Sequence, residues 1–292
     1  MNIVQSRIAR IRQAYHWWEL DRLNDFSWHF QGGREHFKKE FKEIVSSHKW
    51  VFIVGCNNSG TSILQRMLGR VGSVSTFKKE GQRYTQVLPR AYRRGYERVY
   101  MEYADALKMK GSVEQNGPRL VHDWTRHLPQ PLSDIILEKT PANATRMQWL
   151  QECFPNSRFI GLVRNGYAVS EGINRKSHKS FSRAADQWQH ANKVLLENSK
   201  NVDHYRQFHY EDIVEDPGAA VSALAAFVGA EGADISDVAT ASYDLPNVRG
   251  DTPMGLRNLN QDSFGRLTQQ HIDIIYQHAG ELLDHYNYDL NR

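Results

Sequence analysis

Apolar and polar positions along the chain alternate between short continuous apolar runs and longer segments with helical spacing. Residues 50–54 form a run of β-branched and aromatic side chains, which is typical of an inner strand of a parallel sheet. Residues 55–60 follow with turn-forming residues and little side-chain bulk. From Thr61 onward, apolar side chains recur every three to four positions up to Val71. The pattern predicts a strand, a tight polar loop and a helix.

The same alternation continues along the chain. Apolar runs predict strands at 134–137, 158–163 and 207–210. Helical spacing predicts helices at 37–45 and 143–154, one opened by residues 164–170, one around 184–195, and two at about 218–229 and 266–285. Strands that alternate with helices predict an α/β fold in which helices flank a central parallel sheet.

Some segments carry no clear pattern. We expect a helical cover over residues 1–47 and loop at 72–83, where any strand would lie beside the first strand. Residues 84–128 suggest an insertion of helices and loops over the sheet edge, where an acceptor substrate would bind. The segment 242–265 is expected to be a loop. Because no linker or repeat divides the chain, residues 1–292 are interpreted as one domain.

Each predicted strand after the first helix also ends in a polar cluster, as the first strand does. These clusters occupy residues 55–62, 138–143, 164–170 and 210–217. Since ligands bind beyond the carboxyl ends of parallel strands, the clusters should converge on one edge. Free N–H groups at the start of the helix, with the Thr61 and Ser62 hydroxyls, would form a site for an anion. The loop alone fits an ordinary turn equally well.

Composition restricts the class of protein only mildly. The 292 residues are 40% hydrophobic and 24% charged, with a formal net charge of +4. Such a balance suits a small anionic ligand better than a nucleic acid. Cys56 and Cys153 form no disulfide framework and no metal-ligand spacing. The N-terminus lacks the apolar core of a signal peptide, and no run is long enough for a bilayer. We therefore expect a cytoplasmic protein without a membrane anchor or a metal ion.

A strand, loop and helix of this kind first suggest a nucleotide kinase. The phosphate loop of that class needs a lysine directly before its Ser or Thr, and Gly60-Thr-Ser62 has none. No predicted strand ends in the acidic residue expected to hold Mg²⁺. A kinase with an aberrant loop stays an alternative.

Four motifs in order carry a resemblance to a known family. Ser59-Gly-Thr-Ser62, Glu138-Lys-Thr-Pro141, Leu162-Val-Arg164 with a following Ser, and Tyr210-Glu-Asp-Ile-Val-Glu-Asp-Pro217 resemble those of sulfotransferases. That family uses 3′-phosphoadenosine 5′-phosphosulfate (PAPS) as sulfate donor and has a fold like that of P-loop NTPases. The resemblance covers roughly residues 48–290 and is closest to the tyrosylprotein, glycan and bacterial branch.

The resemblance implies a role for several residues. The loop Asn58, Ser59, Gly60, Thr61 and Ser62 would hold the 5′-phosphosulfate, and Arg164 the 3′-phosphate. A serine usually follows that arginine by eight positions. Gly172 stands there instead, so Ser170 is the nearest hydroxyl. Tyr210 would pack near the nucleotide, and Arg266 would close over it.

The resemblance also implies the catalytic groups. Lys139 matches the lysine of the second motif, and Glu80 would be the general base, unless it only pairs with Lys78, Lys79 or Arg83. His122 or His127 could replace Glu80 as base.

The family usually has Lys or Arg just before Ser-Gly-Thr, where this chain has Asn57 and Asn58. Either Lys139 alone neutralises the leaving phosphate, or the chain is an altered or inactive nucleotide-binding protein. The function expected from the resemblance is sulfuryl transfer to a hydroxyl or an amine of a small metabolite or saccharide. The acceptor's identity and the oligomeric state stay open.

Overall fold

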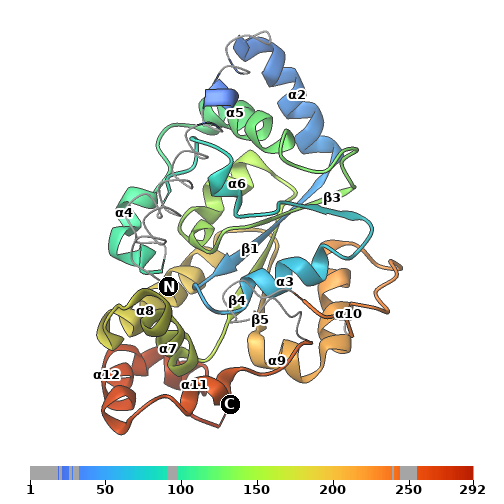
Figure 1. Cartoon of the computed structure of the whole chain (residues 1–292). Coiled ribbons are helices and arrows are strands. Elements are labelled where there is room, and N and C mark those ends of the chain that lie inside the picture. The colour runs from blue at the N-terminus through green and yellow to red at the C-terminus, as the bar shows by residue number, and fades with distance from the viewer. Residues whose placement is uncertain are drawn as a thin grey trace.

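A computed structural model of the chain describes residues 33–90, 98–238, 240–243 and 255–291, and shorter pieces at 19, 22–25 and 28. The predicted first strand is β1 (Lys49–Gly55), and the helix after the loop is α3 (Thr61–Leu68). Three-residue β2 (Val74–Thr76) follows. The other strands are β3 (Ile135–Lys139), β4 (Arg158–Val163) and β5 (Tyr205–His209). All five are parallel, in the order β2-β3-β1-β4-β5 (Figure 1). The predicted α/β fold with a central parallel sheet is confirmed.

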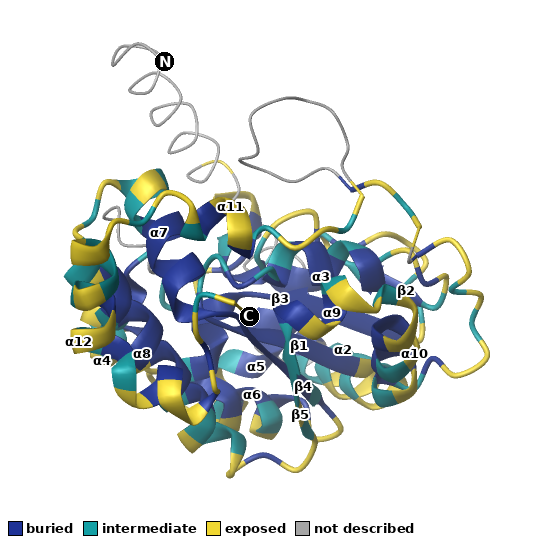
Figure 2. Ribbon diagram, turned by 90° about the horizontal axis from the view of Figure 1, so that it is seen from below, coloured by how far each residue is buried: buried dark blue, intermediate teal, exposed yellow. Residues whose placement is uncertain are grey.

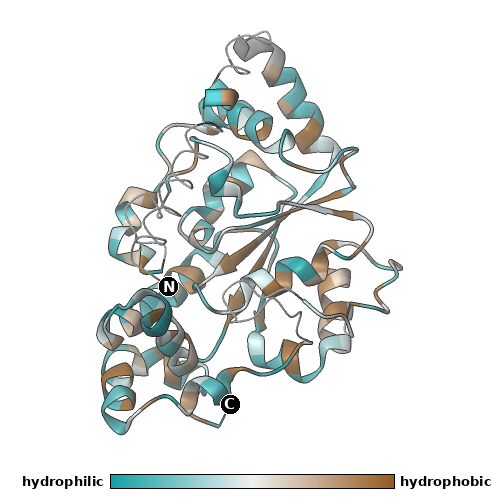
Figure 3. Cartoon of the chain, viewed as in Figure 1, coloured by the Kyte–Doolittle hydropathy of each residue, from teal (hydrophilic) through white to brown (hydrophobic). Residues whose placement is uncertain are grey.

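The central strand β1 is buried on both faces, which explains its continuous apolar sequence. Trp50 and Phe52 point to one face, where the Trp50 ring packs against the tilted ring of Phe154 with centroids 4.2 Å apart. Val51 and Ile53 point to the other face. The hydropathy colouring shows the same strand as a brown band through the middle of the molecule (Figure 3).

Helices cover both faces of the sheet (Figure 2). Apolar residues of α3, α9 and α10 pack on the face that carries Val51. The other face is covered by α5, α6, α7, α8 and α12. Their bounds are α5 Val113–Thr125, α6 Met147–Cys153, α7 Gly166–Ser177, α8 Phe181–Ser199, α9 Tyr210–Glu215, α10 Pro217–Val228 and α12 Gln269–His285.

Several predicted elements differ from the structure. The loop expected at 242–265 contains the short helix α11 (Asn260–Phe264), and the strand expected at 207–210 is β5, which ends at His209 so that Tyr210 begins α9. The helix expected at 143–154 begins as the 3₁₀ helix η4 (Pro141–Arg146), and only α6 is α-helical. The strand considered within 72–83 is β2, which lies beside β3 at the sheet edge and not beside the first strand. The buried, wholly apolar start of β3 takes the place next to β1, and the short polar β2 is left at the edge.

The N-terminal cover and the insertion pack on each other. Helix α2 (Gly33–Ser47) contacts α5, as the rings of Phe37 and His122 show with centroids 4.1 Å apart. Within 84–128, the described residues form η3 (Tyr100–Tyr103), α4 (Ala104–Leu107) and α5. Most of residues 1–32, and residues 91–97 and 244–254, lie outside the described part. Among the described residues, no helix has both the length and the apolar character needed to cross a bilayer.

Candidate active site

The loop between β1 and α3 has a backbone that only certain residues allow. Gly60, at the start of α3, has a φ of 97°, and a Cβ there would lie 2.8 Å from Cδ2 of Tyr210. Asn58 also has a positive φ, 67°, which asparagine tolerates better than most residues. The close approach of Tyr210 to Gly60 therefore requires glycine at this position.

Polar atoms of this loop are buried without partners among the described residues. They include Ser59 Oγ and Asn58 Nδ2. Thr61 is buried beside them, and Ser62 is half-buried. The N–H groups of Thr61 and Ser62 add further donors, because the first N–H groups of a helix have no carbonyl partner within it, whereas the Ile63 N–H already bonds to the Gly60 carbonyl at 2.9 Å. Buried donors with no protein partner fit a bound anion.

Arg164 directly follows β4 and lies against this loop. Its Nη1 donates to the Asn58 carbonyl at 3.1 Å, and its Nε donates to Asn260 Oδ1 at 2.8 Å. Its guanidinium lies over the Tyr210 ring, 4.1 Å from the centroid. Burial lowers the pKa of Arg164 from its usual value, but arginine stays charged in proteins. The residue is 9% exposed. No carboxylate among the described residues forms an ion pair with it, but the charges of Glu211 and Glu171 act on it, and Glu211 accepts from its partner Asn260 at 2.7 Å.

Two further cations meet at the side chain of Asn58. Lys176 Nζ, from α7, donates to Asn58 Oδ1 at 2.9 Å, and Arg98 Nη1 donates to the same oxygen at 3.1 Å. Burial, and then the charges of Arg98, Arg175 and Arg164, lower the pKa of Lys176 to about 8. The loop therefore contains no Lys or Arg in its own sequence, but two cationic side chains from other segments bind its Asn58.

Glu80 and Lys139 form an ion pair, with Lys139 Nζ 3.2 Å from Glu80 Oε1. Gln82 Nε2 donates to the other carboxylate oxygen at 2.7 Å. Burial would raise the pKa of Glu80, but the charges of Lys139 and Arg83 and the Gln82 hydrogen bond lower it below its usual value. The carboxylate is therefore ionised at neutral pH.

The ion pair and the loop lie at the same edge of the sheet, because Lys139 at the end of β3 lies opposite Ile53 near the end of β1. The Tyr100 hydroxyl donates to the Gly55 carbonyl at 2.8 Å at the end of β1. Burial, and then the electrostatic effects of Cys56 and Glu80, raise the pKa of Tyr100 well above its usual value.

Four other predicted residues lie in different surroundings. Ser170 is fully buried, and its Oγ has no partner among the described residues. It lies two positions before Gly172, which faces Asn58, and therefore about 200° away from it around α7. Arg266 forms two hydrogen bonds with Glu171, at 2.7 and 3.0 Å. His122 packs against Phe37, and His127 stacks on Tyr84. The roles assigned to these four from sequence stay predictions.

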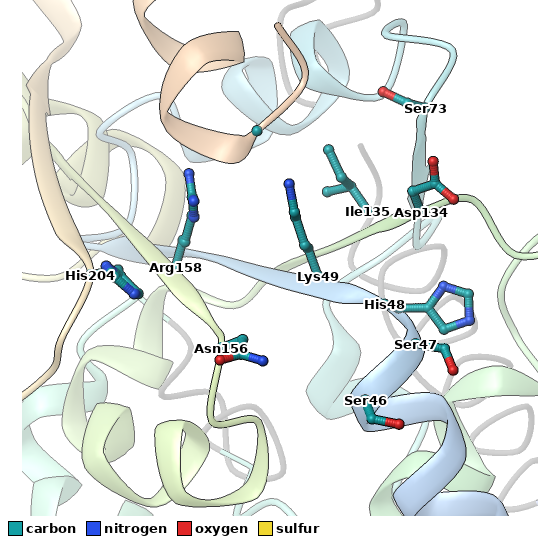
Figure 4. A pocket seen from close by; sticks show the side chains of 11 residues that line it. Ser46, Ser47, His48, Lys49, Ser73, Asp134, Ile135, Asn156, Arg158 and His204 are labelled. Carbon is teal, nitrogen blue, oxygen red and sulfur yellow. The ribbon is translucent and has the colours of Figure 1, made fainter.

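A polar cavity of about 580 Å³ lies at the opposite edge, where the strands begin (Figure 4). Lys49 and Arg158 line it, and both reach the C-terminal end of α10. Arg158 donates to the Phe227 carbonyl, and Lys49 Nζ lies beside Gly229. Cations stabilise the negative end of a helix, which accounts for these two residues. Among the described residues, no group of three or more His, Cys, Asp or Glu side chains could hold a metal ion.

Comparison with known proteins shows the family of the chain. A model of the sulfotransferase family matches residues 51–234, a span from β1 to beyond α10. The chain belongs to the sulfotransferase family.

Two curated relatives and one solved structure illustrate the similarity. Omega-hydroxy-beta-dihydromenaquinone-9 sulfotransferase Stf3 of Mycobacterium bovis is 26% identical over 214 residues, 65% of this chain and 50% of Stf3. Protein-tyrosine sulfotransferase of Drosophila melanogaster is 26% identical over 185 residues, 57% of this chain and 35% of that protein. This chain therefore spans half or less of each relative. Sulfotransferase STF9 of Mycobacterium avium has the same fold, with a TM-score of 0.57 at 10% identity, covering 88% of this chain and 82% of STF9.

Three residues that contact the predicted site residues Asn58 and Arg164 were not predicted from sequence. Lys176 lies one helical turn after Gly172, so helical spacing could have identified it as facing Asn58. Arg98 belongs to a segment with no periodic pattern, and Asn260 is 96 residues from its partner Arg164. No sequence signal indicates either of them.

Proposed function

We propose that this sulfotransferase moves the sulfuryl group of PAPS to a hydroxyl or an amine of a small metabolite or saccharide. The observation that carries the proposal is Arg164: a buried guanidinium that has no ion-paired carboxylate among the described residues, held against a loop in which Ser59 Oγ and Asn58 Nδ2 have no partner within that part of the chain. Such a site suits a ligand with two separate phosphate groups, as PAPS has. The names of the relatives include both a small-molecule and a protein acceptor, so the acceptor class is part of the proposal.

In this proposal, the loop from Asn58 to Ser62 binds the 5′-phosphosulfate with its N–H groups and hydroxyls. Arg164 binds the 3′-phosphate and is oriented by Asn260 and by the face of Tyr210. These two groups of the ligand would supply acceptors to the buried donors that have no acceptor among the described residues.

The missing loop cation has a proposed substitute. Lys176 and Arg98 both donate to the Asn58 side chain, at the position where the family usually has Lys or Arg. Because their charges are close to the loop, they would stabilise the anionic donor without a cation in the loop sequence. The two nearby cations favour an active enzyme over the alternative suggested by Asn57 and Asn58, a nucleotide-binding protein without catalytic activity.

The proposed transfer needs a base for the acceptor proton and a cation near the leaving oxygen. The acceptor oxygen forms a bond to sulfur while the bond from sulfur to the bridging phosphate oxygen breaks, and adenosine 3′,5′-bisphosphate (PAP) leaves. The acceptor proton passes to the ionised Glu80 carboxylate. Lys139, 3.2 Å from Glu80, stabilises the negative charge that develops on the leaving oxygen.

The test is incubation of the protein with PAPS labelled in its sulfuryl group and a panel of hydroxyl and amine acceptors. We expect labelled product and PAP in equal amounts, with or without a metal chelator. Phosphoryl transfer from ATP in the presence of Mg²⁺, with no product from PAPS, would favour the kinase. Binding of PAP without turnover on any acceptor would favour the inactive nucleotide-binding protein.

A further inference from the structure

Glu138, next to the proposed catalytic lysine, is a fully buried carboxylate with three donors. Its Oε1 accepts from the Gly81 N–H at 2.7 Å and from the Thr140 hydroxyl, and its Oε2 accepts from Asn143 Nδ2 at 2.6 Å. Gly81 directly follows Glu80 in the chain. Glu138 therefore binds the backbone next to the proposed base, while Lys139 binds the side chain of that base.

The contacts continue from Glu138 through two more buried side chains. Asn143 Oδ1 accepts from Arg146 Nε at 2.8 Å, and Arg146 Nη1 donates to the Pro89 carbonyl at 3.1 Å. We call Glu138, Asn143 and Arg146 the buried polar chain. It connects the end of β3 with both ends of the segment from Gly81 to Pro89.

Gly81 fits tightly between this chain and α5. A Cβ on Gly81 would lie 2.6 Å from Cγ of Glu138, so glycine is required for the close approach. On the other side, Trp124 Nε1 donates to the Gly81 carbonyl at 3.0 Å. Both backbone polar groups of Gly81 are thus bound by buried side chains, which restricts the backbone that carries Glu80.

Burial of the ionic groups in the buried polar chain is energetically unfavourable. Burial raises the pKa of Glu138 to about 7 and lowers the pKa of Arg146 to about 10. Well-packed apolar residues often give equal or greater stability than buried ionic groups, so stability alone is a weak reason for this arrangement. A requirement for geometry explains it better, because hydrogen bonds fix a backbone more specifically than apolar contacts.

We infer that the buried polar chain positions Glu80 for proton transfer, with Glu138 as a positioning residue that acts through the Gly81 backbone. This rests on the proposed function, in which Glu80 is the base. None of the three side chains takes part in the reaction; they hold the start of the segment so that the carboxylate faces the acceptor.

Glu138→Gln is the sharpest test, because the amide keeps the shape but offers only one acceptor oxygen to donors on both sides. We expect turnover with PAPS to fall about 10- to 100-fold, since a misplacement of about 1 Å can cost that much. PAP affinity should stay within about twofold, because the donor loop lies on β1 and α3. The control is Glu152→Gln, the same change at an exposed site on α6, which should leave both quantities unchanged.

A second variant decides the question if Glu138→Gln does not fold. Arg146→Lys keeps the charge but cannot reach Asn143 and Pro89 together, and it should also lower turnover without loss of PAP affinity. Unchanged turnover in a folded variant, or equal losses of turnover and PAP affinity, would overturn the inference. A wild-type protein that neither binds PAP nor turns over PAPS would instead refute the proposed function.

Discussion

At the scale of single residues, the site concentrates positive charge where the loop sequence has none. Arg164, Lys176 and Arg98 all contact Asn58, through its carbonyl or its side-chain oxygen. Mutual repulsion and burial are unfavourable for these cations in the free protein. Bound phosphates would remove that penalty, so part of the binding free energy should come from relief of repulsion.

We expect PAP binding to depend on pH, because the pKa of Lys176 beside the loop is lowered. Its pKa is lowered to about 8, so the side chain is mostly charged at about pH 7 and mostly neutral at about pH 9. Because only the charged form attracts phosphate, PAP affinity should fall as the pH rises through this range. Calorimetric titration at the two pH values measures the change.

The matched control for Lys176 is Lys176→Arg, because arginine keeps its charge throughout this range. Its PAP affinity should fall clearly less than that of the wild type. Equal pH dependence in the two proteins would remove Lys176 from the nucleotide site.

At the scale of elements, α7 brings one face to the donor loop. Gly172 lies on that face, and a Cβ there would lie 3.6 Å from Cβ and Cγ of Asn58, an ordinary contact. Lys176 follows one turn later on the same face. Gly172 lacks the serine hydroxyl that is usual in the family, but the surroundings leave room for a side chain there.

Gly172→Ser should therefore restore a phosphate partner. We expect PAP to bind about 5-fold more tightly, which corresponds to about 1 kcal/mol for one added hydrogen bond. Gly172→Ala is the control, since it adds the Cβ and the helix propensity without the hydroxyl. If both variants bind PAP alike, the 3′-phosphate does not lie beside this turn of α7.

Elements with a strong local pattern were predictable from sequence. The first strand, its loop and α3 follow from an apolar run and helical spacing, and β4 was predicted at its observed bounds. Contacts between distant segments were not predictable. Glu80 was expected to pair with a nearby cation if it paired at all. Its partner is Lys139, 59 residues away, because the end of β3 meets the segment after β2.

At the scale of the whole molecule, strand order explains how the site divides. β1 lies between β3 and β4, so the donor loop at its end has Lys139 on one side and Arg164 on the other. Arg164 and Lys176, the proposed nucleotide contacts, lie on the side of β4 and α7. The ion pair of Glu80 and Lys139 lies on the side of β3, whereas Arg98 of the insertion reaches the loop itself. In the proposed function, β1 thus lies between the groups that bind the nucleotide and the proposed base.

The most direct test of this account is calorimetric titration of the protein with PAP, in the wild type, Arg164→Ala and Arg158→Ala. The two arginines lie at opposite ends of β4, so the second variant is a matched control. The account predicts binding to the wild type and to Arg158→Ala with similar affinity. It predicts a loss of about 1.5–3 kcal/mol in Arg164→Ala, as for a lost charged hydrogen bond. Absence of binding to the wild type at millimolar PAP, or equal affinity of Arg164→Ala, would contradict it.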